Sequence, residues 1–419
     1  MVTKRAPQRK TRFGIYSIIG EIEGTRWLIM VIALVNARVL TPDEEIPRAT
    51  VILEEGCIAA VGEGLPAPAG AQTMDLDGLT LAPGFIDIHV HGGGGFSLMT
   101  EDGEEIRSYA RWVVSKGVTA FLPTLAAAGR PQMERWLATA TSVGERLPGG
   151  ASPLGVYLEG PFVNPKRKAA FPPEGLRPPD VSELLAHVRT ARGRLKLIAL
   201  APELAGAREL IAAARDQGLV VSIGHSDATY EEALEAISLG ITQATHCFNA
   251  MRPFHHRDPG CLAAILASPQ VAAELIADGV HVHPGAMALL LRAKGPQRTI
   301  LVTDGVAPAG LGPGTYSLAG RQIEVTGGVA TLADGTLAGS VSTMDQMLRN
   351  LVRLGLASLQ EALRMASLNP AAALGLEGGK GRIAPGFDAD LVALDEGLKV
   401  AMTFVGGELA FCRPKDLAA

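Results

Sequence analysis

The sequence predicts a (β/α)8 barrel with a small β-sandwich domain built from both chain ends, and three observations support this. Eight short apolar runs in the middle of the chain alternate with helix-like segments. Residue types that bind metals stand at the ends of several of these runs. Both chain ends consist of short strand-like segments separated by turns, and neither end holds enough apolar residues for a core of its own.

Residues 1–29 do not fit either unit. Their basic start resembles a targeting signal, but Glu21, Glu23 and Arg26 interrupt the apolar patch and no small-residue cleavage site follows. We therefore expect a disordered or wrongly annotated extension, with the true start at Met30 as an alternative.

The small domain is expected to combine residues 30–82 with residues 376–419. In the first part a turn at Glu55 and Gly56 separates two of the strand-like runs. The predicted strands of both parts are residues 31–35, 51–53, 57–61, 73–81, 390–395, 400–405 and 408–412.

The barrel is expected to span residues 83–375. Strands alternating with helices indicate a parallel sheet, and eight such units favour a closed barrel. The predicted strands are residues 85–91, 118–122, 155–159, 196–200, 220–225, 243–246, 272–276 and 299–304. The predicted helices are residues 104–116, 132–146, 181–192, 205–217, 230–239 and 284–292. Residues 306–339 read as an inserted hairpin and loop. An open doubly wound sheet is the runner-up, disfavoured because no GxGxxG motif opens a helix after the first barrel strand.

Composition excludes several functions. The 419 residues are 47% hydrophobic and carry a formal net charge of −5, which argues against disorder and against a nucleic-acid partner. No run of about 18 uncharged apolar residues predicts a membrane span. The four cysteines form no CxxC pair, which favours a reducing cytoplasm over a secreted, disulfide-linked protein.

The first barrel strand carries a His-x-His pair. Residues 85–91 alternate apolar and polar side chains, so His89 and His91 share one face with Asp87. Two imidazoles on one face reach a single metal ion, and the glycines at 92–95 leave open space beside it.

Four further strands end in polar residues of the same kind: Glu159, His225, His246 and Asp304. All of these positions belong to the C-terminal face of the predicted barrel, where active sites occur. Imidazole and carboxylate ligands suit zinc or iron, and such a cation lowers the pKa of water to about 7. Asp304 is best placed to carry a proton from water to a leaving amine. The residues alone therefore predict metal-assisted hydrolysis of a C–N or ester bond.

These residues resemble the site of the amidohydrolase superfamily, and the segments around them resemble its N-acetylglucosamine-6-phosphate deacetylase family. The resemblance covers the chain from about residue 31 to its end. The stretches that carry it are residues 82–87, 158–162, 224–229, 244–251, 276–281, 301–310 and 335–340.

The resemblance implies a role for each matching position. Glu159, His225 and His246 match the main metal ligands, and His89 and His91 match a pair that some members use for a second metal. Asp304 matches the catalytic acid and base. The positions that match groups holding or lining the sugar phosphate are Asn249, Ala250, Arg257, His281, Leu337, Ala338 and Gly339. In this family the arginine at position 257 reaches the neighbouring subunit's site, which implies a homodimer.

One position departs from the family. Many members have a histidine that polarises the acetyl carbonyl where this chain has Phe171. Loss of such a donor costs on the order of 10²–10³ in rate. We expect a second metal at His89 and His91 to polarise the carbonyl instead; the other reading is a different substrate.

The expected activity is hydrolysis of N-acetylglucosamine 6-phosphate to glucosamine 6-phosphate and acetate in amino-sugar metabolism. The expected cofactor is one or two divalent metal ions per subunit, zinc or iron. Two alternatives stay open: an amidohydrolase for a different N-acetylated sugar phosphate or related amide, and a non-catalytic scaffold of the same fold.

Overall fold

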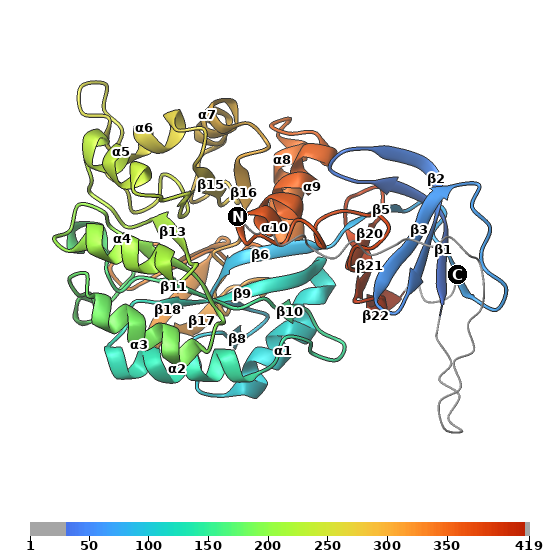
Figure 1. Ribbon diagram of the computed structural model, residues 1–419, viewed down its shortest axis with the longest axis horizontal. Helices are drawn as coiled ribbons and strands as arrows, with labels where there is room; N and C mark the ends of the chain where they lie inside the picture. The colour runs from blue at the N-terminus through green and yellow to red at the C-terminus, as the bar shows by residue number, and fades with distance from the viewer. Residues whose placement is uncertain (1–30, 415–419) are drawn as a thin grey trace, which may run out of the picture.

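The protein consists of a parallel barrel and a β-domain beside it (Figure 1). The computed structural model describes residues 31–414. The predictions for residues 1–29 and for a start at Met30 lie outside the described residues.

The barrel has eight parallel strands, and they match the eight predicted runs. Their order around the barrel follows the sequence: β6 (Phe85–Val90), β9 (Val118–Ala126), β11 (Val156–Glu159), β12 (Leu195–Leu200), β13 (Val220–Ile223), β14 (Gln243–Ala244), β15 (Ala272–Leu275) and β16 (Thr299–Leu301). The segment after β16 returns to β6, where Asp304 N donates to His89 O (2.9 Å) and His91 N donates to Gly305 O (2.8 Å). These contacts close the ring, so the barrel prediction is confirmed and the open sheet is wrong.

Helices follow the strands and cover the outside of the barrel. They are α1 (Gly103–Val113), α2 (Arg130–Ser142), α3 (Val181–Ala191), α4 (Ala207–Asp216), α5 (Tyr230–Ser238), α6 (Gly260–Ala267), α7 (Pro284–Lys294), α8 (Met344–Arg353), α9 (Leu359–Ala366) and α10 (Leu368–Ala373). The six predicted helices are present. Four others, α6 and α8–α10, were not predicted; α6 is apolar around most of its circumference and has no helical periodicity to read. Among residues 31–414, no helix has the length and apolarity needed to cross a membrane.

The remaining short elements lie in the loops. They are the strands β7 (Gly92–Gly93), β8 (Phe96–Ser97) and β10 (Ser152–Pro153), and the 3-10 turns η1 (Val114–Lys116), η2 (Pro165–Arg167) and η3 (Pro173–Gly175). The predicted hairpin after the last barrel strand is present as the antiparallel strands β17 (Gly314–Leu318), β18 (Arg321–Thr326) and β19 (Val329–Thr331).

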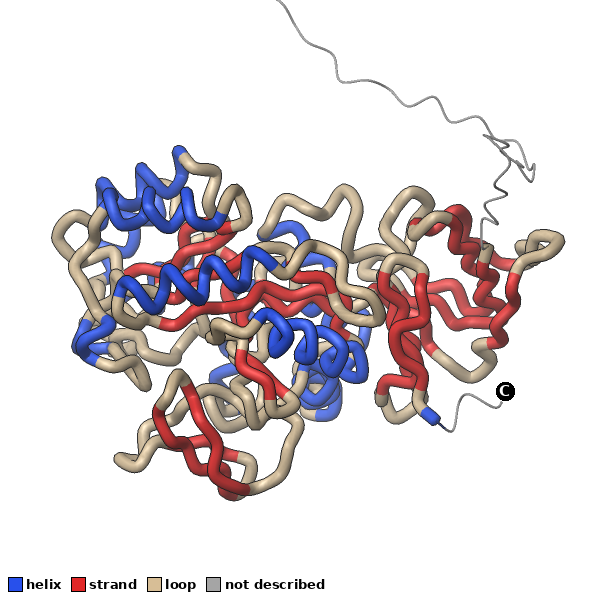
Figure 2. Tube along the Cα trace, turned by 90° about the horizontal axis from the view of Figure 1, so that it is seen from below, coloured by secondary structure: helices blue, strands red, loops and turns tan. Residues whose placement is uncertain are grey.

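The β-domain joins the two chain ends in one sheet. Its strands are β1 (Ile32–Leu40), β2 (Glu45–Glu54), β3 (Cys57–Glu63), β4 (Gln72–Asp75), β5 (Thr80–Pro83), β20 (Leu391–Leu394), β21 (Val400–Val405) and β22 (Glu408–Cys412). The sheet order β22-β21-β20-β5-β1-β2-β3, with β4 on β1, places the C-terminal strands against β5. The prediction of a small domain built from both ends is confirmed, and Figure 2 shows its strands grouped at one end of the molecule.

Alternating side chains fix this domain on the barrel. In β20, Leu391 and Ala393 pack into the core of the β-domain, whereas Val392 and Leu394 pack into the barrel core. Thr403 Oγ1 adds a buried hydrogen bond to Val114 O (2.7 Å). The β-domain therefore supports the N-terminal part of the barrel and leaves the opposite, C-terminal face to the loops.

Candidate active site

A cavity of about 310 Å³ opens at the C-terminal ends of the barrel strands. Loops from the barrel and the β17–β19 hairpin form its walls. The predicted site residues that line it are His91, Glu159, His225, His246, Asn249, Ala250, His281, Asp304, Leu337 and Gly339.

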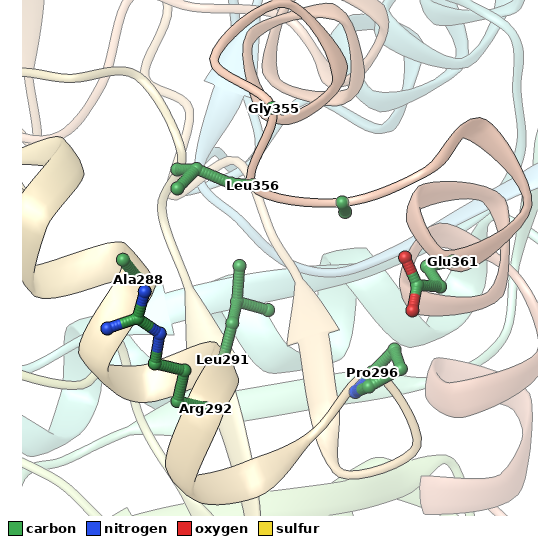
Figure 3. Close-up of a pocket in the computed structure, with 8 residues that line it drawn as sticks. Ala288, Leu291, Arg292, Pro296, Gly355, Leu356 and Glu361 are labelled. Carbon is green, nitrogen blue, oxygen red and sulfur yellow. The ribbon is translucent and has the colours of Figure 1, made fainter.

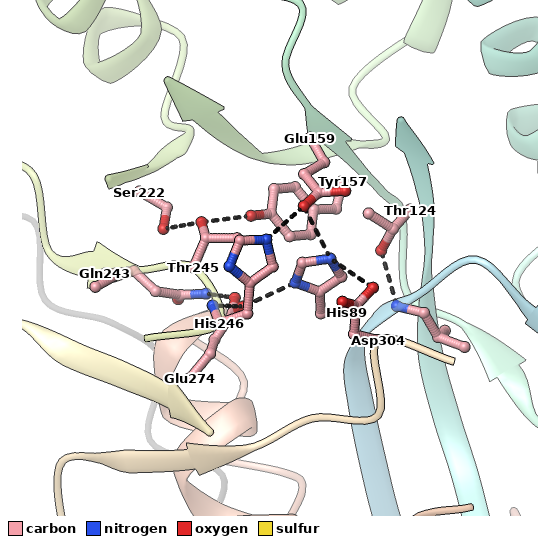
Figure 4. Close-up of polar contacts among 12 residues, drawn as sticks. His89, Thr124, Tyr157, Glu159, Ser222, Gln243, Thr245, His246, Glu274 and Asp304 are labelled. Carbon is pink, nitrogen blue, oxygen red and sulfur yellow. Dashed lines mark hydrogen bonds and ion pairs between the residues drawn. The ribbon is translucent and has the colours of Figure 1, made fainter. Parts of the chain in front are cut away.

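Six side chains at this face form two groups of three. One group is His89, His91 and Asp304, and the other is Glu159, His225 and His246; within each group the ligand atoms lie within 4.8 Å of one another. Five of the six side chains are buried, with 0–5% of each exposed, whereas Asp304 is partly accessible, with 13% of its side chain exposed. The structure thus brings together all six residues predicted at strand ends. Figure 4 shows His89, Glu159, His246 and Asp304 among them.

Glu159 belongs to the second group and also faces the first. Its Oε1 is 3.0 Å from His225 Nε2 and 2.8 Å from His246 Nε2, and its Oε2 is 3.1 Å from His91 Nε2. One carboxylate therefore faces both groups and would be available to a cation held by either of them.

Hydrogen bonds orient three of the four imidazoles. The Nδ1 atoms of His89, His91 and His225 lie 2.8, 3.0 and 2.8 Å from the oxygens of Glu274, Thr124 and Arg167. Because these oxygens accept, each Nδ1 carries a proton, and Nε2 is the nitrogen left to bind a cation in the site. His89 Nε2 has no hydrogen-bond partner among the described residues although it is buried. His225 Nε2 and His246 Nε2 lie only 3.2 Å apart, an arrangement that a cation between them would stabilise.

The backbone is strained where these side chains leave their strands. His225, His246 and Asp304 have φ values of 49°, 26° and 47°. Side-chain-bearing residues in the left-handed region cost about 1–3 kcal/mol each and cluster at functional sites. The strain turns each side chain from the strand end toward the common centre.

Electrostatic coupling in the metal-free site is strong. Burial lowers the pKa of His91, but contacts with Asp304 and Glu159 outweigh it and raise that pKa to about 9. Burial also lowers the pKa of His89, but the carboxylates of Glu274 and Glu159 outweigh burial and raise this pKa well above its usual value. Burial raises the pKa of Asp304, yet the hydrogen bond from His91 and the charge of His89 hold it below its usual value. Protonated His89 and His91 thus balance the carboxylates, and the binding of a cation would release those protons.

Only some of the residues predicted to contact the substrate lie together in the cavity. Asn249, Ala250, His281, Leu337 and Gly339 line the cavity. The Ala338 side chain is instead buried beneath the β17–β19 hairpin. Arg257 lies farther along the same loop as Asn249 and Ala250, but it is exposed and does not line the cavity; its Nη1 lies 2.8 Å from His256 Nε2. Its predicted place in a neighbouring subunit's site stays a prediction.

Three residues of the site were missed in the sequence. Glu274 Oε2 contacts His89, Asp278 Oδ2 lies 2.7 Å from His281 Nδ1, and Arg321 of β18 lines the cavity. Glu274 left a readable signal, a carboxylate within an apolar barrel strand. Arg321 left none, because its position depends on how the hairpin folds over the barrel.

Phe171 stacks on one of the ligand candidates. Its ring lies 4.3 Å from the His225 ring, centre to centre, with 26° between the planes. It also lines the cavity and is buried, with 7% of its surface exposed. The phenyl ring offers no hydrogen-bond donor, but it packs one metal-ligand candidate in place.

A second cavity, of about 200 Å³, lies between α7 and the segment that links α8 to α9 (Figure 3). Apolar side chains, Arg292 and Glu361 line it, and it holds none of the six convergent residues. The chemistry therefore belongs to the cavity at the strand ends.

Comparison with known proteins agrees with this geometry. The model of the amidohydrolase family matches residues 80–410. An N-acetylgalactosamine-6-phosphate deacetylase of Escherichia coli O157:H7 is 37% identical over 89% of this chain and 97% of its own length. The human N-acetylglucosamine-6-phosphate deacetylase is 40% identical over 81% of this chain and 85% of its own length.

Solved structures agree as well. The N-acetyl-D-glucosamine-6-phosphate deacetylase D267A mutant of Mycobacterium smegmatis, in complex with N-acetyl-D-glucosamine-6-phosphate, is similar with a TM-score of 0.85 and 35% identity, covering 91% of this chain and 99% of that one. The Thermotoga maritima N-acetylglucosamine-6-phosphate deacetylase gives a TM-score of 0.81 and 34% identity over 91% and 100%. With its barrel, its six convergent ligand residues and these similarities, the chain belongs to the amidohydrolase family.

Proposed function

We propose that this protein is a metal-dependent deacetylase that hydrolyses N-acetylglucosamine 6-phosphate to glucosamine 6-phosphate and acetate in amino-sugar metabolism. The observation that carries the proposal is Glu159 set between two ligand groups, at the floor of a cavity that Asn249 and His281 also line. The relatives named for this reaction, at 34–41% identity over most of the chain, support the substrate.

The donor set fits a divalent cation. Glu159, His225 and His246 would hold the main ion, and His89 and His91 would hold a second one with Glu159 shared. Two observations support this assignment. The buried Nε2 of His89 has no hydrogen-bond partner among residues 31–414, and hydrogen bonds fix a proton on Nδ1 of His89, His91 and His225. When bound, such ions, zinc or iron, activate water and polarise the acetamide carbonyl.

Asp304 would move the proton. Its carboxylate is the most accessible of the six, and its lowered pKa leaves it ionised at neutral pH, ready to accept a proton from the attacking water. The same oxygen would then protonate the departing amine as the C–N bond breaks. His91, 3.2 Å from Asp304, keeps that carboxylate oriented.

The phosphate of the substrate would be bound away from the candidate metal ligands. Asn249, the Ala250 amide and His281 are the candidate contacts, with Leu337 and Gly339 beside the sugar. A phosphate dianion favours guanidinium and protonated imidazole partners. Arg257 would supply the guanidinium from the second subunit of a homodimer, in keeping with its exposure in one chain.

We also place the protein in the cytoplasm. Cys57, Cys247 and Cys261 are free thiols, as expected in a reducing compartment.

Acetate release tests the function. The substrates are the 6-phosphates of N-acetylglucosamine and N-acetylgalactosamine and the two unphosphorylated sugars. N-acetylglucosamine 6-phosphate is expected to be the best, with turnover abolished by a chelator and restored by zinc or iron. The galacto epimer is the second candidate, because a relative 37% identical to this chain bears that substrate in its name. Equal kcat/KM for phosphorylated and unphosphorylated sugars would contradict the phosphate site, and no turnover of any N-acetylated amino sugar by metal-loaded protein would favour a scaffold.

A further inference from the structure

Glu274 is a charged residue in an unusual place. It lies on β15 in the barrel interior, is fully buried and is not one of the six ligand candidates. Burying a carboxylate is costly unless its oxygens receive hydrogen bonds. Its contacts therefore indicate what the residue does.

Three donors surround the Glu274 carboxylate. Oε1 accepts from Gln243 Nε2 at 2.6 Å, and Oε2 accepts from the His246 backbone N–H at 3.0 Å. The third donor is His89 Nδ1, 2.8 Å from Oε2 (Figure 4). A single oxygen thus binds one residue from each of the two ligand groups.

The contact with His89 decides the state of that imidazole. Because the carboxylate accepts, Nδ1 holds a proton, and Nε2, the nitrogen left to bind a cation, faces Glu159 and Asp304, 3.5 and 3.6 Å away. His91 and His225 are oriented by neutral backbone carbonyls, whereas His89 alone is oriented by a carboxylate. A carboxylate at Nδ1 makes the other ring nitrogen a stronger metal ligand.

We propose that Glu274 is a positioning residue that builds the second metal position, by orienting His89 and joining it to the strand end that carries His246. The inference rests on the proposed function, because it presupposes metal at the His89 and His91 group. Glu274 touches neither substrate nor metal; it acts through His89.

The Glu274→Gln variant tests this with little damage to the fold. Its amide oxygen still accepts from the His246 N–H and from His89 Nδ1, which both lie at Oε2. Its new NH₂ group finds an acceptor when the Gln243 amide turns over, because Gln243 Oε1 is buried and has no partner among the described residues. The variant removes the negative charge opposite His89. We expect the second metal to bind about 10- to 100-fold more weakly and the first to bind as before.

Tyr157→Phe is the matched control. The Tyr157 hydroxyl is equally buried and lies 2.8 Å from Thr245 Oγ1, which keeps its other partner, Ser222 Oγ, at 2.6 Å. The change removes a buried polar group beside His89 but leaves the His89–Glu274 contact intact. Both metals are expected to bind as in the wild type.

The experiment is a titration of metal-depleted full-length protein with Zn²⁺ against a chromophoric chelator, repeated with Co²⁺ and read by its absorption spectrum. The wild type is expected to bind two ions per subunit, and Glu274→Gln to show a weakened second step. In a His89→Ala background, Glu274→Gln is expected to cause no further loss. The inference would be overturned if Glu274→Gln bound the second ion as tightly as the wild type, or if Tyr157→Phe weakened that binding equally. It would also be overturned if the losses from Glu274→Gln and His89→Ala were additive, or if the wild type bound only one ion per subunit. Absence of any metal binding would overturn the proposed function as well.

Discussion

The pairing of His281 with Asp278 is predicted to make substrate affinity depend on pH. Asp278 Oδ2 lies 2.7 Å from His281 Nδ1, and both side chains are buried, with 4% and 7% exposed. Burial lowers the pKa of His281, but the Asp278 carboxylate outweighs it and raises the pKa above 6.5. His281 therefore stays protonated, and able to bind a phosphate dianion, above the pH at which a free histidine loses its charge.

The Asp278→Asn variant removes that support. Without the Asp278 carboxylate, only the charge of Asp304 still opposes burial, so the pKa of His281 is expected to fall and the imidazole to be neutral at pH 7.5. A hydrogen bond with a charged partner contributes about 1.5–3 kcal/mol. With about 1.4 kcal/mol per factor of ten, KM for the phosphorylated substrate is expected to rise roughly 10- to 150-fold.

The assay is KM against pH from 6.5 to 9 for the phosphorylated and unphosphorylated sugars. In the wild type, KM for the phosphorylated sugar is expected to stay low until the pH passes the raised pKa of His281, and in Asp278→Asn the rise begins at lower pH. KM for the unphosphorylated sugar is expected to be flat in both. An equal change for both sugars, or an unshifted profile in the variant, would refute the reasoning.

Three further predictions concern the other residues of the site. Asp304→Asn is expected to lower kcat about 10²- to 10⁴-fold in stopped assays with little change in thermal unfolding temperature, and near-normal turnover would exclude it as the proton carrier. Arg257→Ala and Asp304→Asn subunits are each expected to be nearly inactive alone. When they are mixed, roughly a quarter of wild-type activity is expected to return, because each mixed dimer has one site with both residues intact. No recovery would place Arg257 outside its partner's site. Phe171→His is expected to raise the acetate release of a His89→Ala protein while changing the wild type little, because a new donor matters only where the second metal is missing; a large gain in the wild type would contradict this.

The barrel was predictable because its signals are local. Apolar runs such as residues 85–91 and 299–304, each ending in a ligand residue, lie at the same end of a parallel barrel whatever the loops do. That rule alone predicts that His89, Glu159 and Asp304 lie close together. The pairing of the two chain ends followed from a similar argument, since neither end holds a core.

What the sequence did not reveal depends on contacts between distant segments. The stacking of Phe171 on His225 requires the loop after β11 to fold back over β13. The link from Glu274 to His89 crosses 185 residues, and no spacing rule predicts it. Helix α6 was missed because an apolar helix inside a packed shell shows no amphipathic period.

The central claim is that two ligand groups, joined by Glu159, work as one site. The most direct test is to deplete the protein of metal, add zinc back in steps, and measure acetate release from N-acetylglucosamine 6-phosphate against ions bound per subunit. Activity is predicted to reach its maximum only at two ions, and His89→Ala to stop at one ion with reduced activity. Full activity at one ion, with His89→Ala as active as the wild type, would contradict the claim.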